Sequence, residues 1–191
     1  MTKHPRLIEA LEELKKIGLS QGCIKSIKHI PPQEGRYFPF PPEIHPALVK
    51  ALQEKGISQL YSHQYESWEK TQQKKNIIVV TPTASGKTLC YNLPVLHSIL
   101  ENPSSRAIYL FPTKALSQDQ RAELDDIIKL LPQEIRIFTY DGDTPQDARK
   151  AIRARGHIIL TNPDMLHTGI LPHHTKWIKL FENLQFIVVD E

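Results

Sequence analysis

The sequence has little cysteine and no long apolar run, and each shortage excludes a class of protein. Its 191 residues include only 2 cysteines, Cys23 and Cys90, which are too few for a disulfide framework or a four-cysteine zinc site. We expect both to be reduced thiols. No apolar run approaches the roughly 20 residues that a transmembrane helix needs. The composition therefore favours neither a disulfide-rich secreted protein nor a membrane-spanning one.

The amino terminus also lacks the continuous apolar segment of a secretory signal, so we expect a cytoplasmic protein. Hydrophobic residues make up 40% of the chain and charged residues 24%, as in soluble globular proteins. The length suits one compact domain with an appendage, at about 100 to 200 residues per domain. The net charge of +3 permits binding to a polyanion without requiring it.

The beginning of the chain predicts a small helical and extended extension. Apolar residues recur at helical spacing over residues 5–17, and Gly18 follows as an expected stop. Prolines accumulate over residues 23–46, which indicates an extended connector. We therefore divide the chain into an extension, 1–40, and a main domain, 41–191.

The main domain alternates helical segments with short apolar runs. Helices are expected over residues 43–55, 62–74 with Ser62 as N-cap, 87–101, 114–131 and 145–155. Strands are expected over residues 77–80, 107–111, 135–140, 157–160 and 186–189. Apolar strands that alternate with helices indicate an α/β fold with a parallel sheet covered on both faces. In such folds ligands bind at the carboxyl ends of the strands.

The segment TPTASGKT at residues 81–88 lies between a predicted strand and a predicted helix, as a phosphate-binding loop does. Gly86 permits close approach of the backbone, Lys87 reaches the β and γ phosphates, and the Thr88 hydroxyl can bind Mg2+. The strict pattern has glycine where Thr81 stands, so an ordinary strand-to-helix turn is the alternative. The nucleotide-binding residues predicted here are Thr83, Ala84, Ser85, Gly86, Lys87 and Thr88.

A second signal follows the last apolar run, which ends in Asp190 and Glu191. A hydrophobic strand that delivers two carboxylates is the Walker B arrangement: Asp190 would hold Mg2+ through water, and Glu191 would orient and deprotonate the attacking water. Alone, the pair would be read as a solvated strand end. Together with the loop it predicts a nucleotide hydrolysis site with Lys87, Asp190 and Glu191 as catalytic residues and Thr88 and Asp190 as Mg2+ ligands.

The order of these motifs resembles that of superfamily 2 helicases of the DEAD/DEAH-box type. GISQLYSHQ at residues 56–64 resembles the Q-motif, in which a glutamine reads adenine. The resemblance assigns ATP binding to Gln64, with Tyr61 as a candidate for stacking on adenine and Phe40 as an alternative. It implies a RecA-like P-loop NTPase domain with ATP and Mg2+ as cofactors.

Three further segments resemble the loops with which these helicases hold one nucleic-acid strand: LFPTKALSQ at 110–118, YDGDT at 140–144 and TNPDML at 161–166. Hydroxyls, helix N-termini and a lysine suit contacts with a sugar-phosphate backbone. Each loop alone would be read as a helix N-cap. The residues assigned to nucleic acid are Pro112, Thr113, Lys114, Gln118, Gly142, Asp143, Thr144, Thr161, Asn162, Pro163 and Asp164.

In detail the motifs resemble the bacterial MrfA (YprA-like) DNA-repair helicases more than RNA-directed DEAD-box proteins. This resemblance implies a monomeric ATP-dependent helicase that moves 3′ to 5′ on single-stranded DNA. In the family, motif II continues into a histidine, followed by motif III and a second RecA-like domain, and the 191 residues hold none of these. We therefore expect turnover from a longer parent chain and none from this segment alone.

Three other functions stay open: a small-molecule kinase, an RNA-remodelling helicase, and a binding module without turnover. Three histidines in one short segment suggest a metal site, but no cysteine or carboxylate stands at ligand spacing, so a surface loop is favoured. The residues assigned to non-catalytic roles are His167, His173 and His174 in that loop, Trp68 and Trp177 in packing, and Arg149, Lys150, Arg153 and Arg155 on a solvated helix face that can attract DNA at long range.

Overall fold

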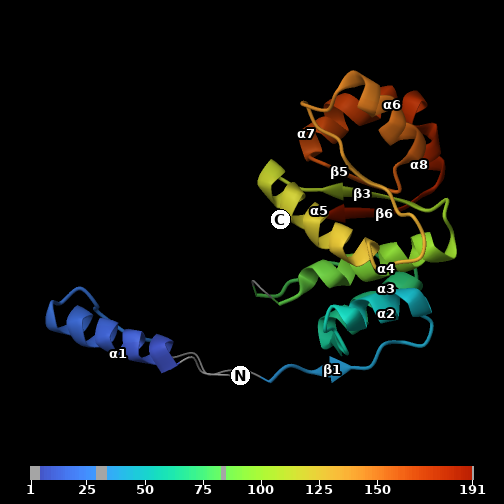
Figure 1. The fold of residues 1–191 in the computed structure, drawn as a ribbon. Helices are drawn as coiled ribbons and strands as arrows, with labels where there is room; N and C mark the ends of the chain where they lie inside the picture. Colours follow the sequence, from blue (N-terminus) through green and yellow to red (C-terminus); the bar gives the residue numbers. More distant parts are fainter. Residues whose placement is uncertain (1–4, 29–33, 83–84, 191) are drawn as a thin grey trace. The chain divides into compact units, whose positions relative to one another are not determined.

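The computed structural model describes residues 5–28, 34–82 and 85–190 and divides the chain into two compact units, Met1–Glu34 and Gly35–Glu191. Figure 1 shows the ribbon of each unit. The first unit holds one helix, α1 (Pro5–Ser20). Leu7, Leu11 and Leu14 are exposed, because a lone helix finds no second apolar surface within this unit.

Gly18 does not end α1, and that prediction is wrong. The helix continues to Ser20, and the turn that follows has Gly22 at a φ of 68°. A Cβ atom on Gly18 would lie 2.3 Å from Cδ1 of Ile24, so this glycine makes room for the returning chain. Composition cannot separate that role from a helix stop, because both need a residue without a side chain.

The second unit begins with β1 (Tyr37–Phe38), which pairs antiparallel with β2 (Leu60–Tyr61). This pairing explains why the observed division falls at residue 34, before the predicted boundary at residue 40. Between the two strands lies α2 (Pro46–Glu54), which begins later than predicted because Pro46 occupies its first turn and His45 caps it.

Helix α3 (Ser62–Gln72) follows β2 directly, so Ser62 is the first helical residue and not the predicted N-cap. Tyr61 precedes the helix, and its backbone N–H donates to Oε1 of Gln64 at 2.8 Å. The glutamine side chain thus binds the backbone N–H directly before the helix, which is the role of the third helical residue in a capping box.

The central sheet has four parallel strands in the order β4-β5-β3-β6. In chain order they are β3 (Arg106–Leu110), β4 (Ile137–Thr139), β5 (Ile158–Thr161) and β6 (Leu184–Val189). The helices among them are α4 (Lys87–Glu101), α5 (Lys114–Ile128), α6 (Gln146–Arg155), α7 (Pro163–Met165), η1 (Leu166–Ile170), η2 (Leu171–Trp177) and α8 (Ile178–Glu182). The predicted parallel sheet with flanking helices is confirmed.

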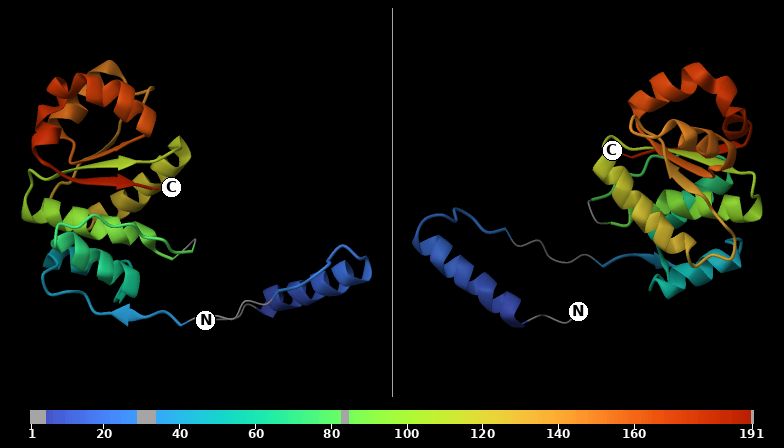
Figure 2. Two further views of the ribbon diagram at one scale, coloured as in Figure 1. Left: turned by 180° about the vertical axis from the view of Figure 1, so that it is seen from behind. Right: turned by 45° about the horizontal axis from the view of Figure 1, so that its top comes forward.

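Two hydrophobic cores lie on the two faces of this sheet. Helices α2, α3 and α4 lie on one side, and α6, α7 and α8 lie on the other (Figures 1 and 2). Trp68 is buried in the first core and Trp177 in the second, so both tryptophans pack as predicted. Successive residues of β3 alternate between the cores: Ala107 and Tyr109 face the first, and Ile108 and Leu110 the second.

Residues 77–80 form no strand, and this prediction is wrong. Ile78 is 92% exposed and Val80 is 89% exposed. A groove of about 1130 Å3 is lined by this segment, by α4 and by β6. No strand of the described residues pairs with the segment. A strand needs a neighbour for its backbone groups as well as apolar side chains, and the apolar run satisfies only the second condition.

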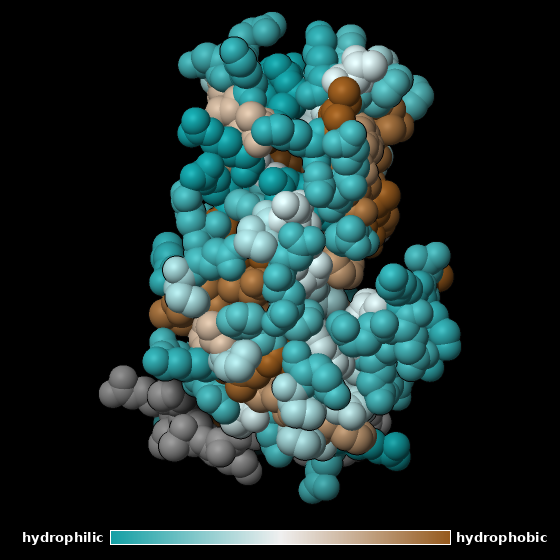
Figure 3. All heavy atoms as spheres, turned by 90° about the vertical axis from the view of Figure 1, so that its right-hand side faces the viewer, coloured by the Kyte–Doolittle hydropathy of each residue, from teal (hydrophilic) through white to brown (hydrophobic). Residues whose placement is uncertain are grey.

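One face of the molecule is mainly hydrophilic, with separate apolar patches (Figure 3). Figure 3 shows one face on which teal side chains surround smaller brown areas. Among residues 5–28, 34–82 and 85–190, no helix has the length and apolar character needed to cross a membrane.

Candidate nucleotide and nucleic-acid site

The predicted site residues gather at one edge of the sheet. Because the four strands are parallel, their carboxyl ends lie together. Residues 112–114 follow β3, residues 140–144 follow β4, residues 162–164 follow β5, and Asp190 follows β6. This edge therefore carries both the carboxylate predicted to serve the nucleotide site and the loops predicted to bind nucleic acid.

The loop before α4 is closed by its own hydrogen bonds. Nζ of Lys87 donates to the carbonyl oxygen of Thr81 at 2.9 Å, and the hydroxyls of Thr81 and Ser85 are 2.6 Å apart. Gly86 has a φ of 77° and leads directly into the helix. Thr83 and Ala84 lie outside the described residues. The lysine and the start of α4 are thus tied to Thr81, and a helix N-terminus beside a lysine is suited to binding phosphate.

Gln64 contacts this loop directly. Its Nε2 donates to the carbonyl oxygen of Gly86 at 2.9 Å, while its Oε1 accepts from Tyr61. The ring of His63 lies beside it, with Nε2 at 3.0 Å from the carbonyl oxygen of Ser85. The amide is 4% exposed, so in this structure it links the Q-motif segment to the loop. Its assignment to adenine stays a prediction.

The two aromatic candidates for adenine stacking lie in different environments. Tyr61 is 37% exposed and precedes the helix that carries Gln64. Phe40 is partly buried and packs against the first core. An exposed ring can be covered by a base, so the geometry favours Tyr61.

Asp190 is held from two directions. Its backbone N–H donates to the carbonyl oxygen of Leu110 at 3.1 Å, and its Oδ2 accepts from the Tyr91 hydroxyl at 3.2 Å. The same hydroxyl lies 3.0 Å from Oε1 of Gln120. Burial, and then the charge of Asp190, raises the pKa of Tyr91 well above its usual value, so Tyr91 remains a protonated donor. Glu191 lies outside the described residues.

The oxygen groups near Tyr91 fit the Mg2+ ion that the family implies. Thr88 stands one helical turn before Tyr91 in α4, and the Tyr91 hydroxyl donates to Asp190, so a hydroxyl and a carboxylate from distant parts of the chain lie on either side of one tyrosine. Hydroxyl, carboxylate and water oxygens are the ligands that Mg2+ prefers. Sequence reasoning missed Tyr91 and Gln120, because neither stands in a recognisable motif.

Some residues assigned to nucleic acid serve the fold first. Thr113 caps α5, where its Oγ1 accepts from the backbone N–H of Leu116 at 3.3 Å. Asn162 caps α7 by accepting from the N–H of Met165 at 2.7 Å. Thr161 is 4% exposed, and its hydroxyl donates to the carbonyl oxygen of Tyr140 at 2.7 Å. Thr161 thus joins two strands and presents no hydroxyl at the surface.

The other assigned residues are mostly at the surface. Thr144 and Asn162 are half-buried. The exposed members are Pro112, Thr113, Lys114, Gln118, Gly142, Asp143, Pro163 and Asp164. Lys114 and Asp143 form an ion pair that joins the loops after β3 and β4. Its hydrogen bond and charge raise the pKa of Lys114 and lower the pKa of Asp143. Both groups therefore stay charged at neutral pH.

The loop at 141–144 is held by Arg149, which was predicted to be solvated. This prediction is wrong: Arg149 is half-buried, its Nε donates to the carbonyl oxygen of Thr144 at 2.9 Å, and its guanidinium lies 5.2 Å from the centre of the Tyr140 ring. Thr144 in turn donates to Oδ1 of Asp141 at 3.1 Å. A basic helix face read from sequence hides the residue that turns inward, because spacing alone does not show which loop lies beside it.

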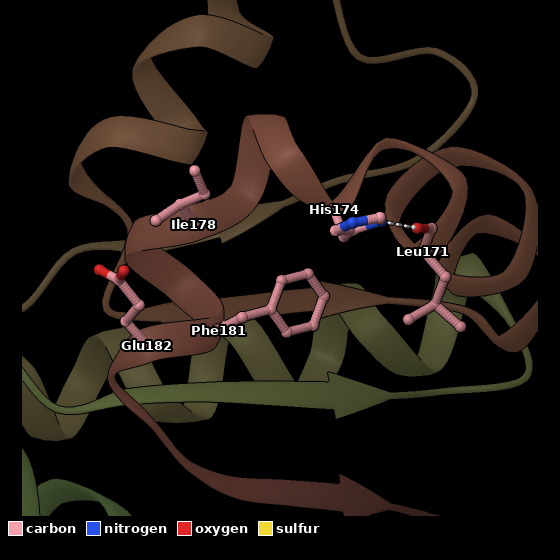
Figure 4. Close-up of a pocket in the computed structure, with 5 residues that line it drawn as sticks. All are labelled: Leu171, His174, Ile178, Phe181 and Glu182. Carbon is pink, nitrogen blue, oxygen red and sulfur yellow. Dashed lines mark hydrogen bonds between the residues drawn. The ribbon is translucent and has the colours of Figure 1, made fainter.

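A separate apolar pocket lies over η2 and α8, away from the sheet edge. Figure 4 shows Leu171, His174, Ile178, Phe181 and Glu182 around it, with Nδ1 of His174 at 3.1 Å from the carbonyl oxygen of Leu171. The region of the three histidines thus carries a hydrophobic hollow. Among the described residues, no cluster of three or more His, Cys, Asp or Glu side chains could hold a metal ion.

Comparison with known proteins assigns the chain to a family. The model of the DEAD/DEAH box helicase family matches residues 61–191, more than half of the chain. The chain belongs to the DEAD/DEAH-box helicases. This excludes the small-molecule kinase considered from the phosphate loop alone, and it means that the arrangement of loop, Gln64 and Asp190 belongs to a family of ATP-dependent enzymes.

Two curated helicases of the family match nearly the whole chain. The ATP-dependent helicase YprA of Bacillus subtilis is 56% identical over 189 residues, which are 99% of this chain and 25% of YprA. The ATP-dependent helicase hrq1 of Schizosaccharomyces pombe is 38% identical over 195 residues, covering 100% of this chain and 18% of hrq1. The chain thus spans a quarter or less of the length of these relatives.

Solved structures agree with the RecA-like fold. The DUF1998 helicase MrfA bound to DNA and AMPPNP is 50% identical with a TM-score of 0.85, covering 93% of this chain and 26% of that one. MrfA bound to DNA is 56% identical with a TM-score of 0.83, covering 85% of this chain and 22% of the other. The resemblance to MrfA-type helicases expected from sequence is confirmed.

Proposed function

We propose that this chain is the ATP-binding motor domain of an ATP-dependent DNA helicase that moves 3′ to 5′ on single-stranded DNA in DNA repair. The observation that carries the proposal is the shared edge of the sheet, where Asp190 and the exposed loops after β3, β4 and β5 lie together. Support comes from MrfA, which has been crystallised with DNA and AMPPNP. Such an edge lets ATP binding and nucleic-acid binding influence the same set of loops.

On the nucleotide side, some of the described residues would supply charge to the phosphates and others would position the nucleotide. Lys87 would exchange its bond to the Thr81 carbonyl oxygen for phosphate oxygens, and backbone N–H groups at the start of α4 would point at the same phosphates. Thr88 and Asp190 would hold Mg2+, which neutralises phosphate charge. Glu191 would orient and deprotonate the attacking water. Thr83, Ala84 and Ser85 complete the proposed ATP-binding loop. Gln64 and Tyr61 would contact the adenine base of ATP.

On the nucleic-acid side, exposed backbone and side-chain groups would hold the sugar-phosphate chain. Lys114 supplies positive charge, and the exposed groups of the loops after β3 and β5 lie beside it. The loop at 140–144 lies next to Lys114 through the ion pair with Asp143. These contacts recognise a backbone and not a base sequence, as a translocating enzyme requires.

The remaining parts of the proposal concern the whole protein. A second RecA-like domain of the same parent chain would complete the ATPase site, and the protein would act as a cytoplasmic monomer. The proposed division is an extension over residues 1–40 and a RecA-like domain over residues 41–191, with residues 35–40 packed into the second compact unit. The proposal assigns turnover to the longer chain and ligand binding to this one.

The first test is the substitution Lys87→Ala. It removes the charge and donors aimed at the phosphates, so we expect at least a roughly tenfold loss of affinity for Mg-ATP, on the order of the 1.4 kcal/mol of one charge-assisted hydrogen bond. Calorimetric titration of the chain with Mg-ATP measures it. Lys75→Ala, an exposed lysine ahead of the loop, is the control. Equal affinity of wild type and Lys87→Ala would refute the nucleotide assignment.

RNA is the second candidate ligand, because contacts to phosphates suit both nucleic acids. ATPase stimulation of the longer protein by single-stranded DNA and by RNA of the same length and sequence separates the two. We expect stimulation by DNA. Stronger stimulation by RNA would replace the proposed substrate and leave the motor-domain assignment in place.

A further inference from the structure

Tyr91 lies where three elements meet at the nucleotide end of the sheet. It stands three residues after Thr88 in α4, so both side chains project from the same face of the helix. Its ring is half-buried and meets the ring of Tyr109 edge-on, with centroids 5.4 Å apart and planes at 86°. This packing fixes the direction of the phenol before any ligand arrives.

The hydroxyl of Tyr91 has more acceptors than hydrogens. Oδ2 of Asp190 lies at 3.2 Å and Oε1 of Gln120 at 3.0 Å. A phenol carries a single hydrogen, so the carboxylate and the amide share one donor. Gln120 is part of α5, whose first turn carries the Thr113 and Lys114 assigned to nucleic acid. The hydroxyl therefore connects α4, the end of β6 and the helix on the nucleic-acid side.

The backbone of Asp190 is already determined by its bond to Leu110. What remains free is the rotation of the carboxylate, and the Tyr91 hydroxyl is its hydrogen-bonding partner within the described residues. Partners that orient a metal-binding carboxylate affect metal affinity strongly without touching the metal. The geometry thus gives Tyr91 a role distinct from core packing.

We propose that Tyr91 is a positioning residue that aims the Asp190 carboxylate toward Thr88, so that both side chains face one divalent cation, and that Gln120 weakens this hold by competing for the same hydrogen. The inference rests on the proposed function, because it presupposes a Mg-nucleotide site at this edge. It adds a specific link between that site and α5.

The test is Tyr91→Phe in the full chain, with AMPPNP affinity measured by calorimetry in Mg2+ and in EDTA. The ratio of the two affinities measures the gain from Mg2+, that is, how much Mg2+ increases the affinity for AMPPNP. Phenylalanine keeps the ring contact with Tyr109 and loses the hydroxyl, so we expect the gain to fall about threefold to tenfold while the affinity in EDTA stays the same. A packing defect would lower both affinities together.

The matched control is Tyr109→Phe, which removes a buried hydroxyl from the same aromatic cluster. This hydroxyl donates to Oδ1 of Asn92 at 2.9 Å and does not contact Asp190. The variant should melt at a lower temperature and keep the full gain from Mg2+. Gln120→Met should increase the gain, because the Tyr91 hydrogen then passes to Asp190 alone, and an unchanged gain would overturn the competition assigned to Gln120.

The outcomes separate the inference from the function on which it rests. Absence of any gain from Mg2+ in the wild type overturns both. A wild-type gain that Tyr91→Phe keeps in full overturns the positioning role alone. A loss in Gln120→Met as large as in Tyr91→Phe shows that the hydroxyl acts through Gln120, and it also overturns the proposal.

Discussion

The absence of a side chain at Gly86 and the position of its carbonyl oxygen determine the local conformation of the predicted phosphate loop. The chain passes Gly86 at a φ of 77°, and the carbonyl oxygen of this residue accepts from Gln64. A Cβ atom here would lie 2.7 Å from Nε2 of that glutamine. The glycine is therefore required twice, for backbone conformation and for the approach of the amide.

Replacing this glycine tests both requirements. We expect Gly86→Ala to lower the free energy of unfolding by about 1 to 2 kcal/mol, the cost of a left-handed conformation for a residue with a Cβ atom. Urea denaturation measures it. Gly142→Ala is the control, because Gly142 has no positive φ and a Cβ there would meet nothing within 4 Å. Equal losses in the two variants would contradict the local explanation.

Arg149 and Thr161 show the limit of reading residues one by one. Arg149 was assigned to solvent, and it binds the carbonyl oxygen of Thr144. Thr161 was assigned to nucleic acid, and its hydroxyl is buried against Tyr140. In both cases the partner lies on another element, so composition and spacing could not identify it.

At the scale of elements, α4 and the segment before it contrast. Both are apolar in sequence, yet Leu93 in α4 is fully buried while Ile78 is 92% exposed. Helix α4 satisfies its own backbone groups and needs only a surface to pack against. An extended segment needs hydrogen-bonding partners on another strand, and residues 77–80 have none among the described strands.

This contrast predicts the cost of two substitutions. Leu93→Ala should lower the free energy of unfolding by about 2 to 5 kcal/mol, because it opens a cavity in the first core. Ile78→Thr should change it by less than about 0.5 kcal/mol, because the side chain is already in solvent. Chemical denaturation followed by circular dichroism gives both values. A large loss in Ile78→Thr would show that residues 77–80 are buried in solution.

Element boundaries were predicted less well than element types. The helices at α4, α5 and α6 and the four strands of the sheet lie where the periodicity places them, to within a few residues. The errors at Gly18 and Ser62 share one cause. A glycine and a serine each have several local uses, and a nearby side chain selects among them: that of Ile24 just after the first helix, and that of Gln64 in the first turn of α3.

At the scale of the whole molecule, a parallel sheet brings together loops that are far apart in the sequence, because the carboxyl ends of its strands lie side by side. Lys114 and Asp143 are far apart in sequence and form an ion pair across two loops. The net charge of +3 is small, so any affinity for nucleic acid depends on where the charges lie. The edge of the sheet supplies that location.

Lys114→Ala tests the placement of charge. If Lys114 binds a phosphate, the slope of log K against log salt for single-stranded DNA should fall by roughly 1. Fluorescence anisotropy with a labelled oligonucleotide over a series of salt concentrations gives this slope. Lys50→Ala on α2 removes the same charge from an exposed helix position outside the predicted loops and should leave the slope unchanged. No change in the Lys114→Ala slope would mean that Asp143 alone pairs with the lysine.

The sequence by itself determined the α/β class, the helices and the four parallel strands of the sheet, and the family, because these depend on local periodicity and on motifs of adjacent residues. Only the tertiary structure decided that residues 77–80 are exposed, that Gln64 binds the loop, that Arg149 turns inward, and that Tyr91 joins Asp190 to Gln120. Arg149 bonds to the loop directly before its own helix, while the other cases depend on the presence or absence of a partner far away in the chain. Such contacts exist only after the sheet has formed, and no local pattern records them.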